Sequence, residues 1–142
     1  MICLDASVAV KLVVDEDESD RALALLARIE RSGDAWVVPA LFFAEVTNVM
    51  HRKFRAGLLS VDEARSAVGR MLALPIGTVH DAALYDTALL LAVRFGLPAA
   101  YDAIYLALCQ REGSELWTAD RRLIRAVRGQ LPWLRPIETF EG

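Results

Sequence analysis

The sequence contains few of the residues that define several protein classes. Of its 142 residues, only two are cysteines and two are histidines. Cys3 and Cys109 are too few for the disulfide framework of a small secreted protein. Both lie in apolar surroundings, which predicts reduced core thiols in a cytoplasmic protein. His51 and His80 have no evident partner, so we expect them at the surface or at helix ends and not in a site.

Long apolar runs are also missing. The longest, residues 88–93, ends at Arg94 and is far shorter than the ~20 residues of a membrane-spanning helix. No basic region precedes an apolar core at the N-terminus, so we expect neither a signal peptide nor a membrane partner. Residues 5–9 lack the glycine-rich turn that a dinucleotide-binding domain places after its first strand.

An excess of positive charge is absent as well. With 16 basic and 19 acidic residues, the formal net charge is −3, which argues against a protein that binds nucleic acid by bulk positive charge. It leaves open a protein whose acids bind metal ions. Hydrophobic residues make up 55% of the chain, which predicts one packed domain over residues 1–142.

Short apolar strands alternate with helices along the chain. We expect strands near residues 1–4, 35–38, 76–79, 115–118 and 134–138. We expect helices near residues 8–13, 20–31, 40–56, 60–74, 81–95, 101–112 and 121–128. Within the second helix, Leu23, Leu26 and Ala27 recur at helical spacing. The alternation predicts a three-layer α/β/α domain with a mainly parallel central sheet.

Acidic residues recur near the predicted strand ends. Asp5 ends the first apolar run, Asp120 follows the strand at 115–118, and Asp102 lies in the first turn of a helix. Glu45 lies in the second turn of another helix, with Asn48 on the same face. Because right-handed crossovers bring strand ends and the following helix starts to one edge, these four carboxylates can share a crevice.

Each acid also has an ordinary explanation when considered alone. Ser7 can cap the helix that follows it, or Asp5 can itself be the cap. Together, however, close carboxylates repel one another unless a cation neutralises them. Carboxylate oxygens suit Mg²⁺ or Mn²⁺, and such a metal can activate a water and stabilise charge on a phosphoryl group.

Four short motifs resemble, in order and spacing, the PIN-domain family of metal-dependent ribonucleases, and most closely its VapC-type toxins. They are Asp5-Ala6-Ser7, Glu45 with Asn48, residues 101–107 and residues 118–123. The resemblance covers essentially the whole chain. It implies Mg²⁺- or Mn²⁺-dependent endoribonuclease activity, an RNA substrate, a cognate antitoxin protein and a homodimer.

The resemblance also implies roles for individual residues. The metal-binding and catalytic set is Asp5, Glu45, Asp102 and Asp120, and the supporting polar residues are Ser7, Asn48 and Thr118. Of the basic residues, Arg121 and Arg122 adjoin Asp120 and are the best candidates to contact the RNA backbone. For Lys11, Arg52, Lys53, Arg125 and Arg128, a solvated helix face is the simpler interpretation.

Other interpretations remain open from the sequence. A haloacid-dehalogenase-type site would need an aspartate where Ser7 stands. A catalytically silent PIN-like binding module, or another Mg²⁺-dependent phosphoryl-transfer domain, is the alternative to a nuclease. An apolar surface around Leu12, Val13 and residues 23–26, bordered by the acidic residues 15–20, is a candidate groove for a partner segment.

Overall fold

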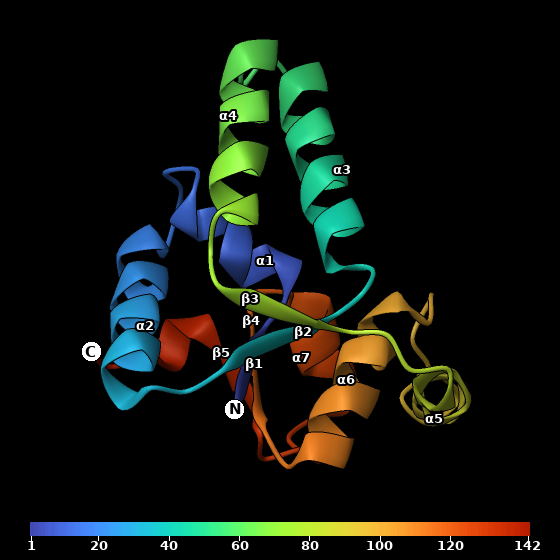
Figure 1. Cartoon of the computed structure of the whole chain (residues 1–142). Helices are drawn as coiled ribbons and strands as arrows, with labels where there is room; N and C mark the ends of the chain where they lie inside the picture. The colour runs from blue at the N-terminus through green and yellow to red at the C-terminus, as the bar shows by residue number, and fades with distance from the viewer.

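The centre of the molecule is a sheet of five parallel strands (Figure 1). The computed structural model covers residues 1–142. In spatial order the strands are β3 (Ile76–Val79), β2 (Trp36–Pro39), β1 (Ile2–Leu4), β4 (Glu115–Thr118) and β5 (Leu134–Pro136). All four pairings are parallel, so the carboxyl ends of the strands share one edge. The prediction of a mainly parallel sheet is confirmed.

Helices cover both faces of this sheet. They are α1 (Ala6–Ala9), the short 3₁₀ helix η1 (Val10–Leu12), α2 (Ser19–Ser32), α3 (Phe42–Arg55), α4 (Val61–Leu72), α5 (Ala83–Arg94), α6 (Tyr101–Glu112), α7 (Arg121–Val127) and the 3₁₀ helix η2 (Ile137–Thr139). Figure 1 shows α2 on one side of the strands and α5 with α6 on the other. The three-layer α/β/α prediction is therefore confirmed.

The strand β1 is central because its residues are apolar on both faces. Cys3 and Leu4 are fully buried, as expected for a strand covered by helices on each side. One continuous cluster of 38 buried apolar residues forms the core. Cys3 and Cys109 are both free thiols within it, as the sequence predicted. None of the helices combines the length and apolar character needed to cross a membrane.

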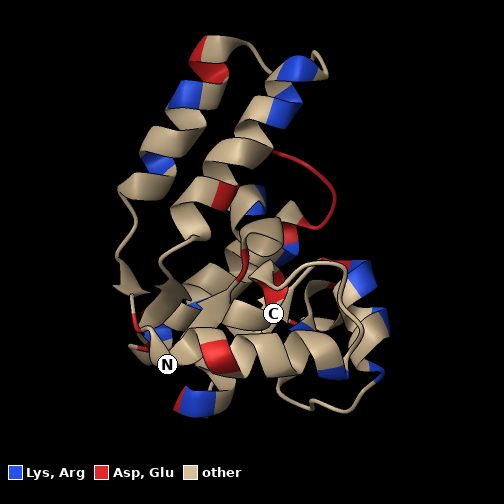
Figure 2. Ribbon diagram, turned by 90° about the vertical axis from the view of Figure 1, so that its right-hand side faces the viewer, with Lys and Arg blue, Asp and Glu red and all other residues tan.

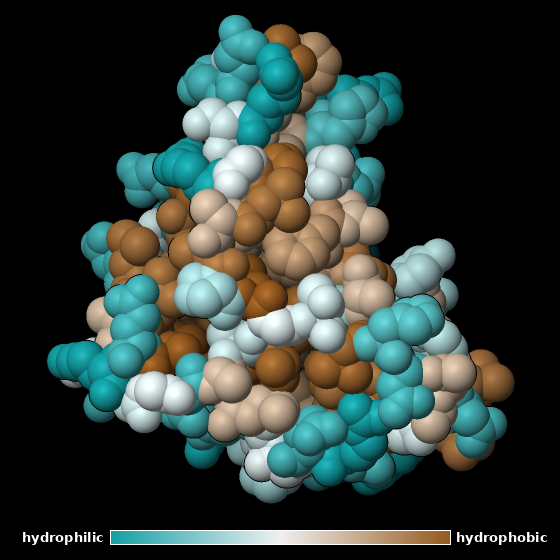
Figure 3. Space-filling view, viewed as in Figure 1, coloured by the Kyte–Doolittle hydropathy of each residue, from teal (hydrophilic) through white to brown (hydrophobic).

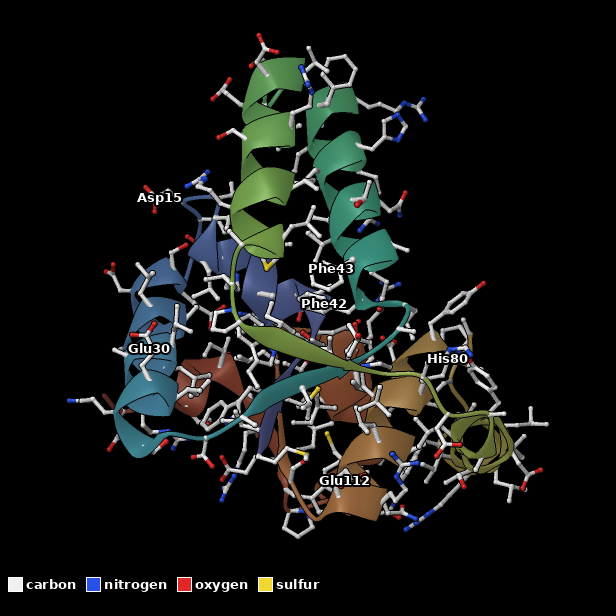
Figure 4. The ribbon with its side chains drawn as sticks, viewed as in Figure 1. Asp15, Glu30, Phe42, Phe43, His80 and Glu112 are labelled. Carbon is white, nitrogen blue, oxygen red and sulfur yellow. The ribbon has the colours of Figure 1, made fainter.

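The α3–α4 hairpin projects from the sheet (Figure 1). Gly57 turns the chain after α3 with φ of +74°, a conformation that favours glycine. Ser60 and Glu63 then form the capping box of α4. Figure 4 shows Phe42 and Phe43 at the foot of α3, over the sheet. Figure 3 shows apolar side chains exposed across the middle of this face, below the hairpin tip.

The structure decides between the two caps that the sequence offered for α1. The cap of α1 is Asp5 and not Ser7, because the Asp5 carboxylate accepts a hydrogen bond from the backbone of Val8. The buried side of α2 consists of Ser19, Ala22, Leu25 and Ile29. Leu23 and Ala27 are exposed and Leu26 is half-buried, because another side of this helix packs against the core.

The residues before α2 are less solvated than a simple turn would be. Residues 15–18 form an acidic loop in which Glu16 accepts hydrogen bonds from the Nζ atoms of Lys11, at 3.3 Å, and Lys53, at 2.7 Å. The Lys11 side chain is itself buried. Lysines from η1 and α3 therefore pair with Glu16 and, at 3.9 Å, with Glu18, while Asp15 and Asp17 are exposed.

Candidate active site

The first part of the site lies where β1 ends. Asp5 is only 6% exposed, and its Oδ1 accepts hydrogen bonds from Ser7 Oγ and from the Val8 backbone N–H. An unbroken buried strand followed at once by a helix leaves this carboxylate little solvent. Asp5 is thus both the helix cap that one interpretation predicted and a member of the site.

Two hydroxyl groups connect the ends of β1 and β4. Ser7 Oγ accepts a 2.8 Å hydrogen bond from the Ala119 N–H and lies 3.4 Å from Thr118 Oγ1. Thr118 Oγ1 in turn accepts a 3.0 Å bond from the Asp120 N–H. Ser7 and Thr118 therefore hold the two strand ends together and set the position of Asp120 relative to Asp5.

Asp120 caps helix α7. Its Oδ1 accepts hydrogen bonds from the backbone N–H groups of Arg122, at 2.8 Å, and Leu123, at 3.3 Å. Both bonds use the same oxygen, so Oδ2 keeps its capacity to accept another ligand. The capping role expected of a lone aspartate and a role in the site are compatible here.

Glu45 is held by a tyrosine to which the sequence assigned no role. Its Oε1 accepts a 2.7 Å hydrogen bond from the hydroxyl of Tyr105, which is buried on α6. Tyr105 lies three residues after Asp102 and therefore on the same face of the helix. That spacing was the signal in the sequence that could have assigned Tyr105 to the site, because it places an acid, Asp102, and a hydrogen-bond donor, Tyr105, on one face of α6.

These residues surround one cavity of about 170 Å³ at the carboxyl edge of the sheet. We call it the carboxylate cavity. Its lining contains Asp5, Ala6, Ser7, Glu45, Asn48, Val49, Arg52, Asp102 and Asp120. All four acids predicted as a set are thus brought together from four separate segments, with Asn48 among them. Thr118 does not line the cavity and acts through Ser7 and Asp120.

Burial dominates the electrostatics of the cavity. It raises the pKa of Asp5 to about 6, although hydrogen bonds from Ser7, Thr118 and Val8 act in the opposite direction. Burial also raises the pKa of Glu45 to about 7, against the hydrogen bond from Tyr105 and with the neighbouring negative charges of Asp5 and Asp102.

Asp102 follows the same pattern. Its pKa is raised, first by burial and then by the charge of Asp120, while Arg122 lowers it. The ionised form of the cluster is therefore unfavourable without added positive charge.

The donor set fits a hydrated divalent cation. Carboxylate oxygens are the ligands that Mg²⁺ and Mn²⁺ prefer. No three acidic, histidine or cysteine side chains converge closely enough to hold a bare ion directly. Mg²⁺, however, usually keeps several waters and binds through one or two carboxylates, so some of the four acids would act through water.

Five of the basic residues singled out from the sequence fall into three groups. Arg52 lines the carboxylate cavity. Arg121 and Arg122 have side chains that are 76% and 82% exposed, and Arg122 Nε lies 4.0 Å from Asp120 Oδ1. Both are thus beside the cavity without lining it. Lys11 and Lys53 are bound to the acidic loop and do not line the carboxylate cavity.

A sequence profile of the PIN domain matches residues 2–129. The chain belongs to the PIN-domain family. Ribonuclease VapC3 of Mycobacterium tuberculosis (strain H37Rv) is 35% identical to it over 127 residues, which cover 88% of this chain and 86% of the relative. Ribonuclease VapC3 of Pyrobaculum aerophilum is 31% identical over 124 residues, 86% of this chain and 91% of that one. The chain is a PIN-domain protein of the VapC type.

Solved structures agree with this assignment. A crystal structure of a Pyrobaculum aerophilum protein has a TM-score of 0.70 and 25% identity, covering 97% of this chain and 91% of that one. VapC20 of Mycobacterium tuberculosis, a Sarcin-Ricin loop cleaving toxin, has a TM-score of 0.68 and 18% identity, covering 96% and 100%. A toxin–antitoxin complex from Klebsiella pneumoniae has a TM-score of 0.60 and 19% identity, covering 91% and 94%. The last two likenesses concern the fold alone.

Proposed function

We propose that this PIN-domain protein is a Mg²⁺- or Mn²⁺-dependent endoribonuclease that acts as the toxin of a toxin–antitoxin pair. One observation carries the proposal: four carboxylates from separate segments, Asp5, Glu45, Asp102 and Asp120, line one small cavity. Two relatives at 35% and 31% identity are named ribonucleases. An acidic cavity without a histidine or a cysteine suits metal-assisted hydrolysis of a phosphodiester.

Asp5 and Asp102 would hold the metal, with Glu45 and Asp120 completing the shell directly or through water. When bound, the metal supplies an activated water and positive charge at the reacting phosphate. Ser7 and Thr118 keep Asp5 and Asp120 in register through their hydrogen bonds.

The remaining residues orient the site and the RNA. The Tyr105 hydroxyl orients the Glu45 carboxylate, and Asn48 adds a neutral polar group to the lining. Arg52 lies within the cavity lining, while the exposed Arg121 and Arg122 lie beside it. Their charges suit backbone phosphates on either side of the cleaved bond.

An antitoxin partner would use a second, larger cavity. A hollow of about 710 Å³ separates the residues after η1 from the α3–α4 hairpin, with Val13, Leu59 and Ala67 in its lining and Asp15 and Asp62 among its acids. This composition suits a segment that is apolar on one side and basic on the other. Of the groove predicted from the sequence, Val13 is present, whereas Leu25 is buried in the core.

A homodimer is supported by helix α5. Leu89, Leu90 and Val93 are 59%, 64% and 73% exposed, while the opposite side of the helix packs on α6. Figure 2 shows α5 lengthwise at the front, nearly free of charged residues between its ends. A helix that is apolar all round is normally covered all round, and a second copy of the chain would supply the cover. A monomer in light scattering would contradict this.

Two further proposals concern organisation and location. The single core cluster supports one domain over residues 1–142. The two buried, unpaired thiols, Cys3 and Cys109, support a reducing compartment and therefore a cytoplasmic protein.

The test is incubation of the purified protein, freed of any antitoxin, with a mixed RNA pool in Mg²⁺ or Mn²⁺. We expect discrete cleavage that EDTA abolishes. The variant Asp102→Asn should lose on the order of a hundredfold or more in rate, since even supporting residues of metal sites cost about 10–100-fold. Glu30→Gln is the matched control, because Glu30 lies on the exposed side of α2 (Figure 4).

The outcomes separate the alternatives. No cleavage by a folded, metal-binding protein would favour the catalytically silent binding module. Cleavage that survives Asp102→Asn would place the chemistry elsewhere. Metal-dependent release of phosphate from small phosphoesters, with RNA left intact, would favour a different phosphoryl-transfer domain.

A further inference from the structure

A separate apolar pocket of about 240 Å³ lies beside the carboxylate cavity. Pro39 and Val79, the last residues of β2 and β3, form part of it, and Ala40 N donates a 3.1 Å hydrogen bond to Val79 O. Two tyrosines complete it, Tyr85 of α5 and Tyr101 of α6. Figure 1 shows the chain passing beside α6 on its way from β3 to α5.

The two tyrosines are unusually open for aromatic residues. Tyr85 is 48% and Tyr101 66% exposed. The ring of a fully packed tyrosine would be mostly buried, as Tyr105 is on the same helix. The fold therefore leaves two aromatic surfaces at one rim of the pocket without a covering group.

The pocket and the carboxylate cavity share no lining residue, but their linings adjoin along the chain. Tyr101 immediately precedes Asp102, and Leu41, in the pocket lining, is one helical turn before Glu45. The sheet order also brings the two linings near each other. Strand β2, which ends in the pocket lining at Pro39, lies next to β1, and neighbouring strands are about 5 Å apart. The pocket and the carboxylate cavity therefore both adjoin the first turns of α3 and α6, on neighbouring positions of the chain.

We propose that this pocket, with Tyr101 as its stacking surface, receives a nucleobase of single-stranded RNA next to the cleaved phosphate. The inference rests on the proposed ribonuclease function and adds a specificity site to it. Single-stranded RNA is characteristically bound by stacking its bases on aromatic side chains. An apolar pocket with exposed rings offers this contact, whereas the acidic cavity beside it would repel further phosphates.

A polar group at the pocket rim can read the edge of the base. Asp81 contributes to the lining and is held from two sides, by the Ala83 N–H at 2.9 Å on Oδ1 and by Arg111 on Oδ2. A carboxylate fixed in this way retains acceptor capacity for an exocyclic amino group of a base.

The test compares two substitutions at one position. Tyr101→Leu removes the aromatic ring and keeps an apolar side chain, while Tyr101→Phe keeps the ring. Affinity for a labelled single-stranded RNA, measured in EDTA to prevent cleavage, should fall about 5- to 150-fold in the leucine variant, the range for one base–aromatic stack. It should stay within about twofold in the phenylalanine variant. Tyr85→Leu provides a second variant of the same rim.

Abasic RNA identifies the contact. Removing the base beside the cleavage point should weaken wild-type binding by a similar factor and should cost Tyr101→Leu nothing more, because the two changes delete one interaction. With the carboxylates intact, Tyr101→Leu should raise KM and leave kcat close to that of the wild type. Thermal unfolding and light scattering would be run on every variant.

Each outcome decides the question. Unchanged RNA affinity in both leucine variants, or an equal loss in Tyr101→Phe, would overturn the nucleobase pocket while leaving the nuclease in place. A loss of affinity that accompanies a change from dimer to monomer would also overturn it, since the pocket would then belong to the dimer face. A wild-type protein that neither binds nor cuts RNA would refute this inference and the proposed function together.

Discussion

The acidic loop and the carboxylate cavity both gather negative charge, but only the loop has lysines in direct contact with its carboxylates. The cavity has Arg52 in its lining and Arg122 Nε 4.0 Å from Asp120 Oδ1. In the loop, Glu16 contacts Lys11 and Lys53 within 3.3 Å. In the cavity, the acids receive hydrogen bonds from hydroxyl and backbone groups, and burial raises the pKa of Asp5 and Glu45. The difference teaches that the acids paired with lysines contribute to the fold, whereas the cavity acids, which have no lysine partner, are the ones proposed to bind a cation.

The largest expected effect comes from breaking the ion pairs of the acidic loop. Lys11→Met should lower the free energy of unfolding by about 3 kcal/mol, because Glu16 and Glu18 would lose the buried charge they face. Urea unfolding measures this, and Mn²⁺ should not restore the loss. Arg65→Met, which removes an exposed pair with Asp62, is the control and should change little. A negligible effect of Lys11→Met would show that the loop is solvated after all.

A change of stability with pH, of similar or slightly smaller size, should come from the acids of the carboxylate cavity. The pKa values of Asp5, about 6, and Glu45, about 7, lie above their usual 3.8 and 4.5. The folded state therefore binds more protons, and the stability contribution is full below about pH 4 and is lost as the pH rises through 6 and 7.

Metal-free protein should consequently lose up to about 3 kcal/mol in total between pH 4 and pH 8, mostly from Asp5 and less from the more exposed Glu45. Denaturant unfolding in EDTA over this range provides the measurement. Mn²⁺ at pH 8 should recover much of the loss because it favours ionised carboxylates. A flat profile in EDTA would mean that another group compensates the cavity.

The smallest expected effect compares the loop and the cavity most directly. Replacing one acid by its neutral amide should change the stability in opposite directions in the carboxylate cavity and in the acidic loop. Asp102→Asn should raise the stability of the metal-free protein at pH 8, since its pKa is raised by burial and by Asp120. Glu16→Gln should lower stability by about 1 kcal/mol through the loss of its lysine contacts. Paired thermal melts in EDTA compare the two; equal signs would remove the distinction drawn between the clusters.

Much of the fold followed from local patterns. The five strands, the capping box at Ser60 and the stop at Gly57 were all recognisable from residue type and spacing. The four acids of the candidate site were also recognisable, because their positions after strands and in early helical turns place them at one sheet edge. The choice between Ser7 and Asp5 as the cap of α1 could not be made from the sequence, since both side chains can accept the same backbone hydrogen bond.

By itself, the sequence determined the order of strands and helices and the identity of the acids at the strand ends, because periodicity and capping chemistry act within a few residues. Only the tertiary structure decided which charges are compensated. The contacts between Lys53 and Glu16 and between Tyr105 and Glu45 join residues 37 and 60 positions apart. Such contacts depend on how helices pack across the sheet, and that geometry also opened the tyrosine-lined pocket beside Asp102.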